Sequence, residues 1–132
     1  MSRSQWRSAL IVSLRLVITL FFVPAILVKL RKPGAWAQLF TIWGYPPWGP
    51  WVISIIEIFG LAALWIPAFA RSASVALMVT TAGAAATWLI HGPRSTAAYP
   101  GTILVLVASL AWLQQAAVRR DSHIERPEPL SR

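Results

Sequence analysis

The stretch WVISIIEIFGLAALWIPA, residues 51–68, decides the class of fold. Its side chains are almost all apolar, and Glu57 is the one charged residue within it. Glu57 is also the only acidic residue before Asp121. An ionisable side chain at the centre of a membrane segment costs about 2.5–3.5 kcal/mol on insertion scales unless it is paired, neutralised or hydrated. Glu57 is therefore the first candidate for a functional site.

Four apolar stretches are long enough to cross a bilayer as helices, which takes about 17–25 residues each. They cover about residues 9–28, 51–68, 73–90 and 98–117. The composition, 57% hydrophobic and 12% charged residues, excludes an ordinary soluble domain. We predict an all-α fold, an integral membrane four-helix bundle over residues 1–118. A polar tail over residues 119–132 is expected to be disordered.

The segment between the first two spans, residues 35–50, is too short and too rich in Pro and Gly to cross the membrane. It includes GYPPWGP at residues 44–50, where each proline fixes its own φ and restricts the preceding residue. We predict an aromatic connector that lies at the interface or enters the membrane as a re-entrant turn. Trp43, Tyr45, Pro46 and Trp48 mark it, and its aromatic rings either anchor the interface or stack on a ligand.

The net charge of +8 comes from basic residues at the ends of the spans. This distribution indicates contact with anionic lipid headgroups of the bilayer and argues against nucleic acid as a partner. One side of the membrane would carry both termini and five basic residues, Arg3, Arg7, Arg71, Arg119 and Arg120. The other side would carry four, Lys29, Arg31, Lys32 and Arg94. The positive-inside rule then favours cytoplasmic termini in a multi-pass protein of the cell membrane.

Two basic residues accompany Glu57 within the membrane part. Arg15 and Lys29 are 14 residues apart, so they share one face of the first helix and lie about 21 Å apart along it. Ser54, Glu57 and Gly60 form a small and polar stripe on the second span. If these spans are antiparallel neighbours, Glu57 lies between the depths of the two cations. Either Arg15 reaches outward or Lys29 inward, and one pairing would let the carboxylate stay ionised.

Several roles are open for these residues. The pair could only fix the register of the helices, Glu57 could bind a proton or a ligand, or it could face a cavity in its neutral form. Arg15 could instead extend to its own interface. His91, at the end of the third span, is either an interfacial cap or a proton-transfer partner of Glu57.

The third span is rich in small residues, including Ala82, Gly83, Ala86 and Thr87. Small residues at four-residue spacing allow helix backbones to approach closely in lipid. We therefore expect this helix to be the most buried one. There are no cysteines and no cluster of metal ligands, so no metal is expected, and no self-sufficient catalytic group is visible.

The chain resembles the DoxX and DoxX-like membrane proteins over about residues 10–117. The resemblance rests on Lys29-Leu30, Phe40, Trp43-Gly44-Tyr45-Pro46-x-Trp48, Glu57-x-x-Gly60, Arg71 and the small-residue span Met78…Ala82…Ala84-x-x-Thr87. A glycine usual in the family three residues before the lysine is replaced by Ile26. The resemblance implies a four-helix membrane bundle. It also implies a connection to membrane redox systems, since the family name derives from subunits of thiosulfate:quinone oxidoreductase, or to the assembly of partner proteins.

Three functions follow from these observations. The first is an accessory membrane subunit of a redox system, with a quinone as candidate ligand near Glu57 or a docking face for a partner. The second is a structural or chaperone-like assembly factor. The third is a small proton-coupled transporter, which would have to act as a homo-oligomer because four spans are few for a transport path.

Overall fold

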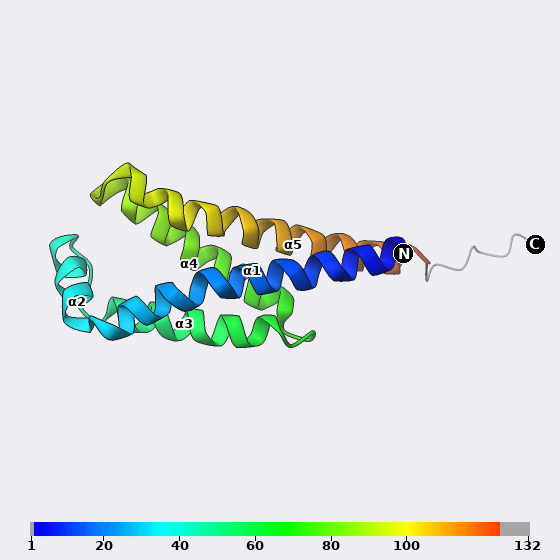
Figure 1. Ribbon diagram of the computed structural model, residues 1–132, viewed down its shortest axis with the longest axis horizontal. Helices are drawn as coiled ribbons and strands as arrows, with labels where there is room; N and C mark the ends of the chain where they lie inside the picture. Colours follow the sequence, from blue (N-terminus) through cyan, green and yellow to red (C-terminus); the bar gives the residue numbers. More distant parts are fainter. Residues whose placement is uncertain (1, 125–132) are drawn as a thin grey trace, which may run out of the picture.

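The computed structural model describes residues 2–124, without the side chains of residue 117 and of residues 120–124. Within this part the chain forms helices and no strands. They are α1 (Arg3–Arg31), α2 (Pro33–Ile42), α3 (Gly49–Leu64), α4 (Ala70–His91), the short 3-10 helix η1 (Arg94–Ala97) and α5 (Ala98–Ile124). Figure 1 shows α1, α3, α4 and α5 along the length of the molecule, with α2 turned across one end. The N-terminus and the end of α5 lie at the opposite end.

Local sequence accounts for the ends of these helices. Ser2 caps α1 in a reciprocal pair with Gln5, which satisfies backbone donors that the first turn leaves open. Lys32 separates α1 from α2 with a φ of −130° and a ψ of 58°, outside the helical region, because Pro33 disfavours helical geometry in the residue before it. Gly44 has a φ of +80°, which reverses the chain after α2 at a position where a side chain would be strained.

The core lies where α1, α3, α4 and α5 meet, and each of these helices packs against two of the other three. Apolar residues from all four form one cluster: Ile18, Phe22, Ile26, Leu61, Leu64, Ala73, Leu77, Ile103, Val107 and Leu110. Many large apolar side chains outside this cluster are exposed, including Leu20, Phe59 and Trp112. Such a surface is typical of helices whose outer faces contact lipid.

Three helical segments of the described chain are long and apolar enough to cross a membrane: Arg3–Arg31, Ala70–His91 and Arg94–Ala116. The predicted second span, residues 51–68, is represented by α3, which has 16 residues and is about 24 Å long. It ends at Leu64 and is followed by a turn, because Pro67 disfavours helical geometry in the residue before it. The length of α3 alone therefore does not establish a fourth span.

The expectation that the third span would be the most buried helix is wrong. In α4 the buried residues lie in the first half, from Ala70 to Thr81, whereas Ala82, Gly83 and Ala86 are exposed. A Cβ added to Gly83 would meet nothing within 4 Å. The reason is the direction of the helix, since α4 diverges from α3 toward the end of the molecule where α2 lies (Figure 1). A larger share of the span in α5 is buried, 28% against 22%.

The connector and the tail have more helix than the sequence indicated. The first part of the connector is α2, none of whose residues is fully buried, and only the part after Ile42 forms tight turns. At the other end of the chain, α5 continues through residues 119–124, the first part of the predicted tail. The remainder of that tail, residues 125–132, lies outside the described residues.

Candidate functional site: an ion pair among apolar helices

The polar stripe of α3 faces the other helices. Ser54, Glu57 and Gly60 follow one another at three-residue intervals, which places them on one side of the helix. All three are buried, and the side chain of Ser54 is 2% exposed. The isoleucines and Phe59 between them point outward and are exposed. The α3 sequence thus directs its only carboxylate into the protein.

Lys29 is the cation that contacts Glu57. Its ammonium group, from the last turn of α1, donates a hydrogen bond to Oε2 of Glu57 and forms an ion pair with it. The two side chains are only 12% and 9% exposed. Because both charges are largely removed from solvent, each needs the other, and loss of one partner would leave an uncompensated charge.

Arg15 is not part of this ion pair. It is half-buried on α1, and its Nε atom is buried with no hydrogen-bond partner within residues 2–124. Thr19, one turn further along α1, accepts a hydrogen bond from the indole of Trp65 at 3.4 Å. Arg15 therefore lies beyond the end of α3 and cannot pair with Glu57, the only carboxylate of that helix.

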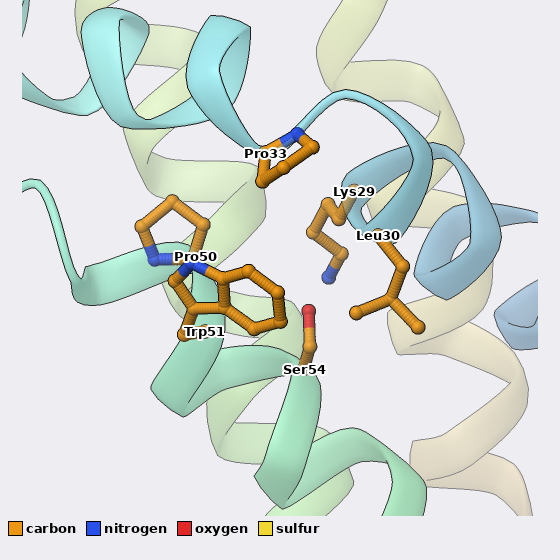
Figure 2. A pocket seen from close by; sticks show the side chains of 6 residues that line it. All are labelled: Lys29, Leu30, Pro33, Pro50, Trp51 and Ser54. Carbon is orange, nitrogen blue, oxygen red and sulfur yellow. The ribbon is translucent and has the colours of Figure 1, made fainter.

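A narrow recess adjoins the ion pair on the side of the connector. It is lined by Lys29, Leu30, Pro33, Pro50, Trp51 and Ser54 (Figure 2). In Figure 2 the ammonium group of Lys29 and the hydroxyl of Ser54 both point into it. The recess has no space for a water-sized molecule. A quinone ring, which is several times larger, does not fit this recess as it stands.

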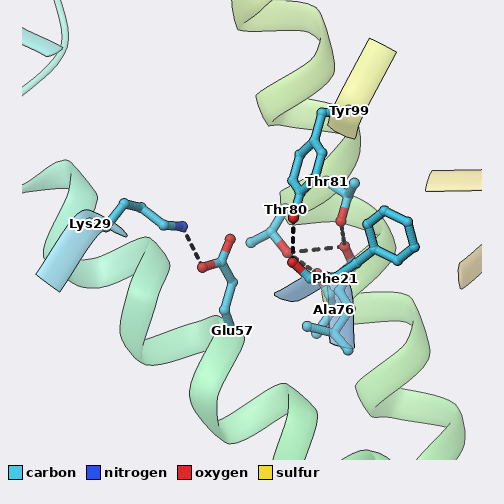
Figure 3. Close-up of polar contacts among 8 residues, drawn as sticks. Phe21, Lys29, Glu57, Ala76, Thr80, Thr81 and Tyr99 are labelled. Carbon is cyan, nitrogen blue, oxygen red and sulfur yellow. Dashed lines mark hydrogen bonds and ion pairs between the residues drawn. The ribbon is translucent and has the colours of Figure 1, made fainter. Parts of the chain in front are cut away.

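Hydroxyl groups from α4 and α5 lie on the other side of Glu57. Figure 3 shows Thr80 and Tyr99 on the opposite side of the carboxylate from Lys29. The hydroxyl of Tyr99 donates a hydrogen bond to the backbone carbonyl of Phe21. That carbonyl lies next to the one that Pro24 leaves without its helical donor. Tyr99 therefore supports α1 at the turn that its internal proline weakens.

The aromatic connector contacts the end of α4. Trp43 packs edge-on against Trp88, with ring centroids 5.0 Å apart, and stacks on His91 at 5.9 Å. Tyr45 meets the edge of His91 at 5.9 Å, and its hydroxyl lies 3.4 Å from that of Thr87. Aromatic pairs at these distances contribute about 0.5–1.5 kcal/mol beyond the area they bury. The connector is therefore attached to α4 mainly by ring contacts.

The remaining predicted site residues take different positions. Pro46 is exposed in the turn, where its carbonyl accepts a hydrogen bond from Gly49, and Trp48 is 61% exposed. His91 occupies the last turn of α4 and makes no hydrogen bond or ion pair with any residue in the described range. Its contacts are with the connector rings. No group of three potential metal ligands occurs in the part of the chain that the structure describes.

Two polar features of the structure were missed in the sequence. Tyr99 had no predicted role, although a tyrosine near the level of an internal proline on another helix could have suggested a hydrogen bond. Gln114 is a polar residue within an apolar helix, 7% exposed, and its Oε1 lies 3.1 Å from the hydroxyl of the fully buried Ser74. Its polarity inside the run 98–117 was the available signal.

The model of the DoxX-like family matches residues 13–110, which is most of the chain and includes both residues of the ion pair. Comparisons with curated proteins and with solved structures give no match. The family match confirms the resemblance seen in the sequence motifs. The protein belongs to the DoxX-like family.

Proposed function

We propose that this small membrane protein is an accessory, non-catalytic subunit of a membrane redox system, and that it acts by docking a partner rather than by holding a substrate. The observation that carries the proposal is the direct pairing of Lys29 with Glu57 beside a recess that admits no water. The ammonium group of Lys29 and the carboxylate of Glu57 are paired with each other. They are therefore suited to fixing helices in place, and the redox association comes from the family resemblance.

The proposal includes a four-span arrangement in which α3 crosses together with α1, α4 and α5. The outer face of α3 supports this, since Val52, Ile55 and Phe59 are exposed and apolar. The turn after α3 is also apolar and extends the hydrophobic length. With four spans the beginning of α1 and the end of α5 lie on one side, which agrees with their common end in Figure 1, and the basic residues favour the cytoplasm.

The direct test is to purify the full chain from its native membrane in a mild detergent and to analyse it by native mass spectrometry. An oxidoreductase subunit bound in a fixed ratio is the expected result. Lys29→Met should reduce this complex because it disturbs the helices, whereas Arg3→Gln should not. Recovery of the protein alone from cells in which every membrane oxidoreductase is intact would refute the proposal. A bound quinone would show that the recess opens, and would overturn the non-catalytic assignment.

An assembly factor is the second candidate function. The Lys29–Glu57 ion pair and the large exposed apolar surface are as compatible with this function as with the first one. Both features suit a protein that binds a client protein through the outer faces of its helices. The two functions differ in when the protein is needed. If it is an assembly factor, its depletion after the partner has matured should leave the partner active. An accessory subunit would be needed throughout turnover.

A further inference from the structure

The face of α1 that carries Arg15 is covered along one half of the helix and open along the other. Phe22 and Ile26, which follow Arg15 on this face, are only 2% and 7% exposed. Val12, which precedes it, is 44% exposed, and Ser8 is exposed as well. Spacings of three and four residues place all of these side chains on one side of the helix. The same face therefore loses its cover toward the beginning of α1.

The end of α3 accounts for this change. The indole of Trp65, the first residue after α3, donates to the hydroxyl of Thr19 at 3.4 Å. Before that level α1 is held by α5, where the guanidinium of Arg7 donates to the carbonyl of Leu113 at 2.7 Å, and α1 does not pack against α4. A strip about 16 Å long thus has no helix of the described chain beside it on the side of α3. The open strip consists of Ser8, Val12, Arg15 and Thr19.

Arg15 gives the open strip an unpaired charge. Its guanidinium makes no hydrogen bond or ion pair with any residue that the structure describes, and its buried Nε atom lacks an acceptor. The guanidinium stays protonated in proteins, so it cannot avoid this cost by losing its charge. Glu57, the carboxylate of the neighbouring helix, is already paired with Lys29. The strip therefore requires an acceptor from outside residues 2–124.

The shape and chemistry of the open strip suit a helix. A length of about 16 Å corresponds to about three helical turns. The small hydroxyl residues Ser8 and Thr19 are of the kind found where helices meet in lipid. Exposed Trp65 and Ile66 form an apolar rim at the inner end of the strip. A lipid phosphate could bind Arg15, but it would leave the rest of the strip uncovered.

We propose that the open strip receives a transmembrane helix of a partner protein, and that a carboxylate of this helix pairs with Arg15. Charge complementarity selects the carboxylate, because charged side chains inside membranes pair with one another. The partner helix takes the place along the first half of α1 that α3 takes along the second half, where Glu57 pairs with Lys29. This inference rests on the proposed function and names the chemistry of the docked partner.

The experiment uses the full chain in its native membrane, with a photo-crosslinking benzoylphenylalanine in place of Val12. We expect an adduct with a second protein. Mass spectrometry of the crosslinked peptide should place it in an apolar segment that contains an aspartate or a glutamate. The matched control carries the same group in place of Leu20, which is 72% exposed and points about 140° away from Arg15. The control should give adducts with lipid only.

Substitutions of Arg15 test the ion pair itself. Arg15→Met should lower the yield of the adduct at position 12 at least about tenfold, because the carboxylate of the partner loses its counter-charge inside the membrane. Arg15→Lys should retain most of the yield. Arg15→Glu should restore the adduct when the acidic residue of the partner is replaced by lysine, which a purely structural role of Arg15 does not predict. Unfolding of each variant in detergent shows whether the fold is retained.

Two kinds of result overturn the proposal. One is an adduct at position 12 with lipid alone, with a second copy, or with residues 125–132 of the same chain. The other is an unchanged yield in Arg15→Met. If an oxidoreductase subunit still binds to Arg15→Met in a fixed ratio, the proposed function stands and the open strip is not its docking site. If the crosslinked helix belongs to a protein outside any redox system, the docking site stands and the proposed function fails.

Discussion

Lys29 and Arg15 lie on the same face of α1 and have the same charge, yet only one of them is paired. Lys29 meets Glu57 because α3 runs alongside the last turns of α1. Arg15 lies about 21 Å away along the helix, past the point where Trp65 already belongs to the turn after α3. The difference shows that a shared helix face does not decide pairing. Pairing is decided by the length of the neighbouring helix, α3, because α3 extends alongside Lys29 but ends before the level of Arg15.

A proline separates the two cations. Pro24 lies inside α1, which continues through it, and the hydroxyl of Tyr99 bonds to the carbonyl of Phe21 on the preceding turn. The Lys29 end of α1 is therefore held by contacts from α3 and α5, at Glu57 and Tyr99. The Arg15 end is held by apolar packing, by a hydrogen bond of 2.7 Å from the guanidinium of Arg7 to the backbone carbonyl of Leu113 in α5, and by the weak contact of Thr19 with Trp65.

Removal of Lys29 should have the largest effect. Lys29→Met leaves the carboxylate of Glu57 buried without a partner, and such a change costs about 3–5 kcal/mol. We expect a loss of this order in the free energy of unfolding in detergent micelles, followed by tryptophan fluorescence, for which the chain has eight reporters.

The double variant Lys29→Met with Glu57→Met is the control for this prediction. It removes both charges and should recover most of the loss, because an apolar pair of similar volume replaces an ion pair at little cost. If the double variant were as unstable as the single one, the pair would not be what stabilises this end. Its function would then have to be sought in a ligand.

The comparison also shows what sequence could predict. The apolar stretches predicted an all-helical membrane protein, and the 14-residue spacing placed both cations on one face of α1. Sequence left the choice between Arg15 and Lys29 open because it did not give the level at which α3 ends. That level depends on the turn at Pro67 and on the tilt of the helices, which are set by packing among distant residues.

The small-residue span was the clearest failure of the same kind. Gly60 and Gly83 look alike in sequence, but only Gly60 lies at a close helix contact. A Cβ at Gly60 would lie 2.8 Å from a methyl group of Leu77, and one at Gly83 would touch nothing within 4 Å. A residue type that permits close packing does not determine where two helices cross.

These two glycines give the next prediction, since Gly60 holds α3, and therefore Glu57, against α4. Gly60→Val should destabilise the protein by about 1–3 kcal/mol, as overpacked interiors do. Gly83→Val should change stability by much less, because its site is open. Both are measured by the same unfolding experiment. If both variants lost the same free energy of unfolding, the close contact between α3 and α4 would not be at Gly60.

Tyr99→Phe tests the support of α1 between the two cations. The ring remains, and only the hydrogen bond to the Phe21 carbonyl is lost. Interhelical hydrogen bonds in membranes contribute about 0.6 kcal/mol on average and at most about 1.7 kcal/mol. We expect a loss within that range. Tyr45→Phe, whose hydroxyl makes only a 3.4 Å contact with Thr87, is the matched control and should cost less.

Arg15→Met should have the smallest effect and the opposite sign. The substitution is the same in kind as Lys29→Met, but it removes a cation whose buried Nε has no partner in the described chain. Desolvation of an unpaired charge is relieved, and no carboxylate is left behind, so unfolding should be unchanged or slightly more costly. A loss comparable to that of Lys29→Met, in detergent and in lipid alike, would mean that Arg15 has a partner within the protein. In that case both cations of α1 would be paired, and the two ends of the helix would differ only in the partner that each cation contacts.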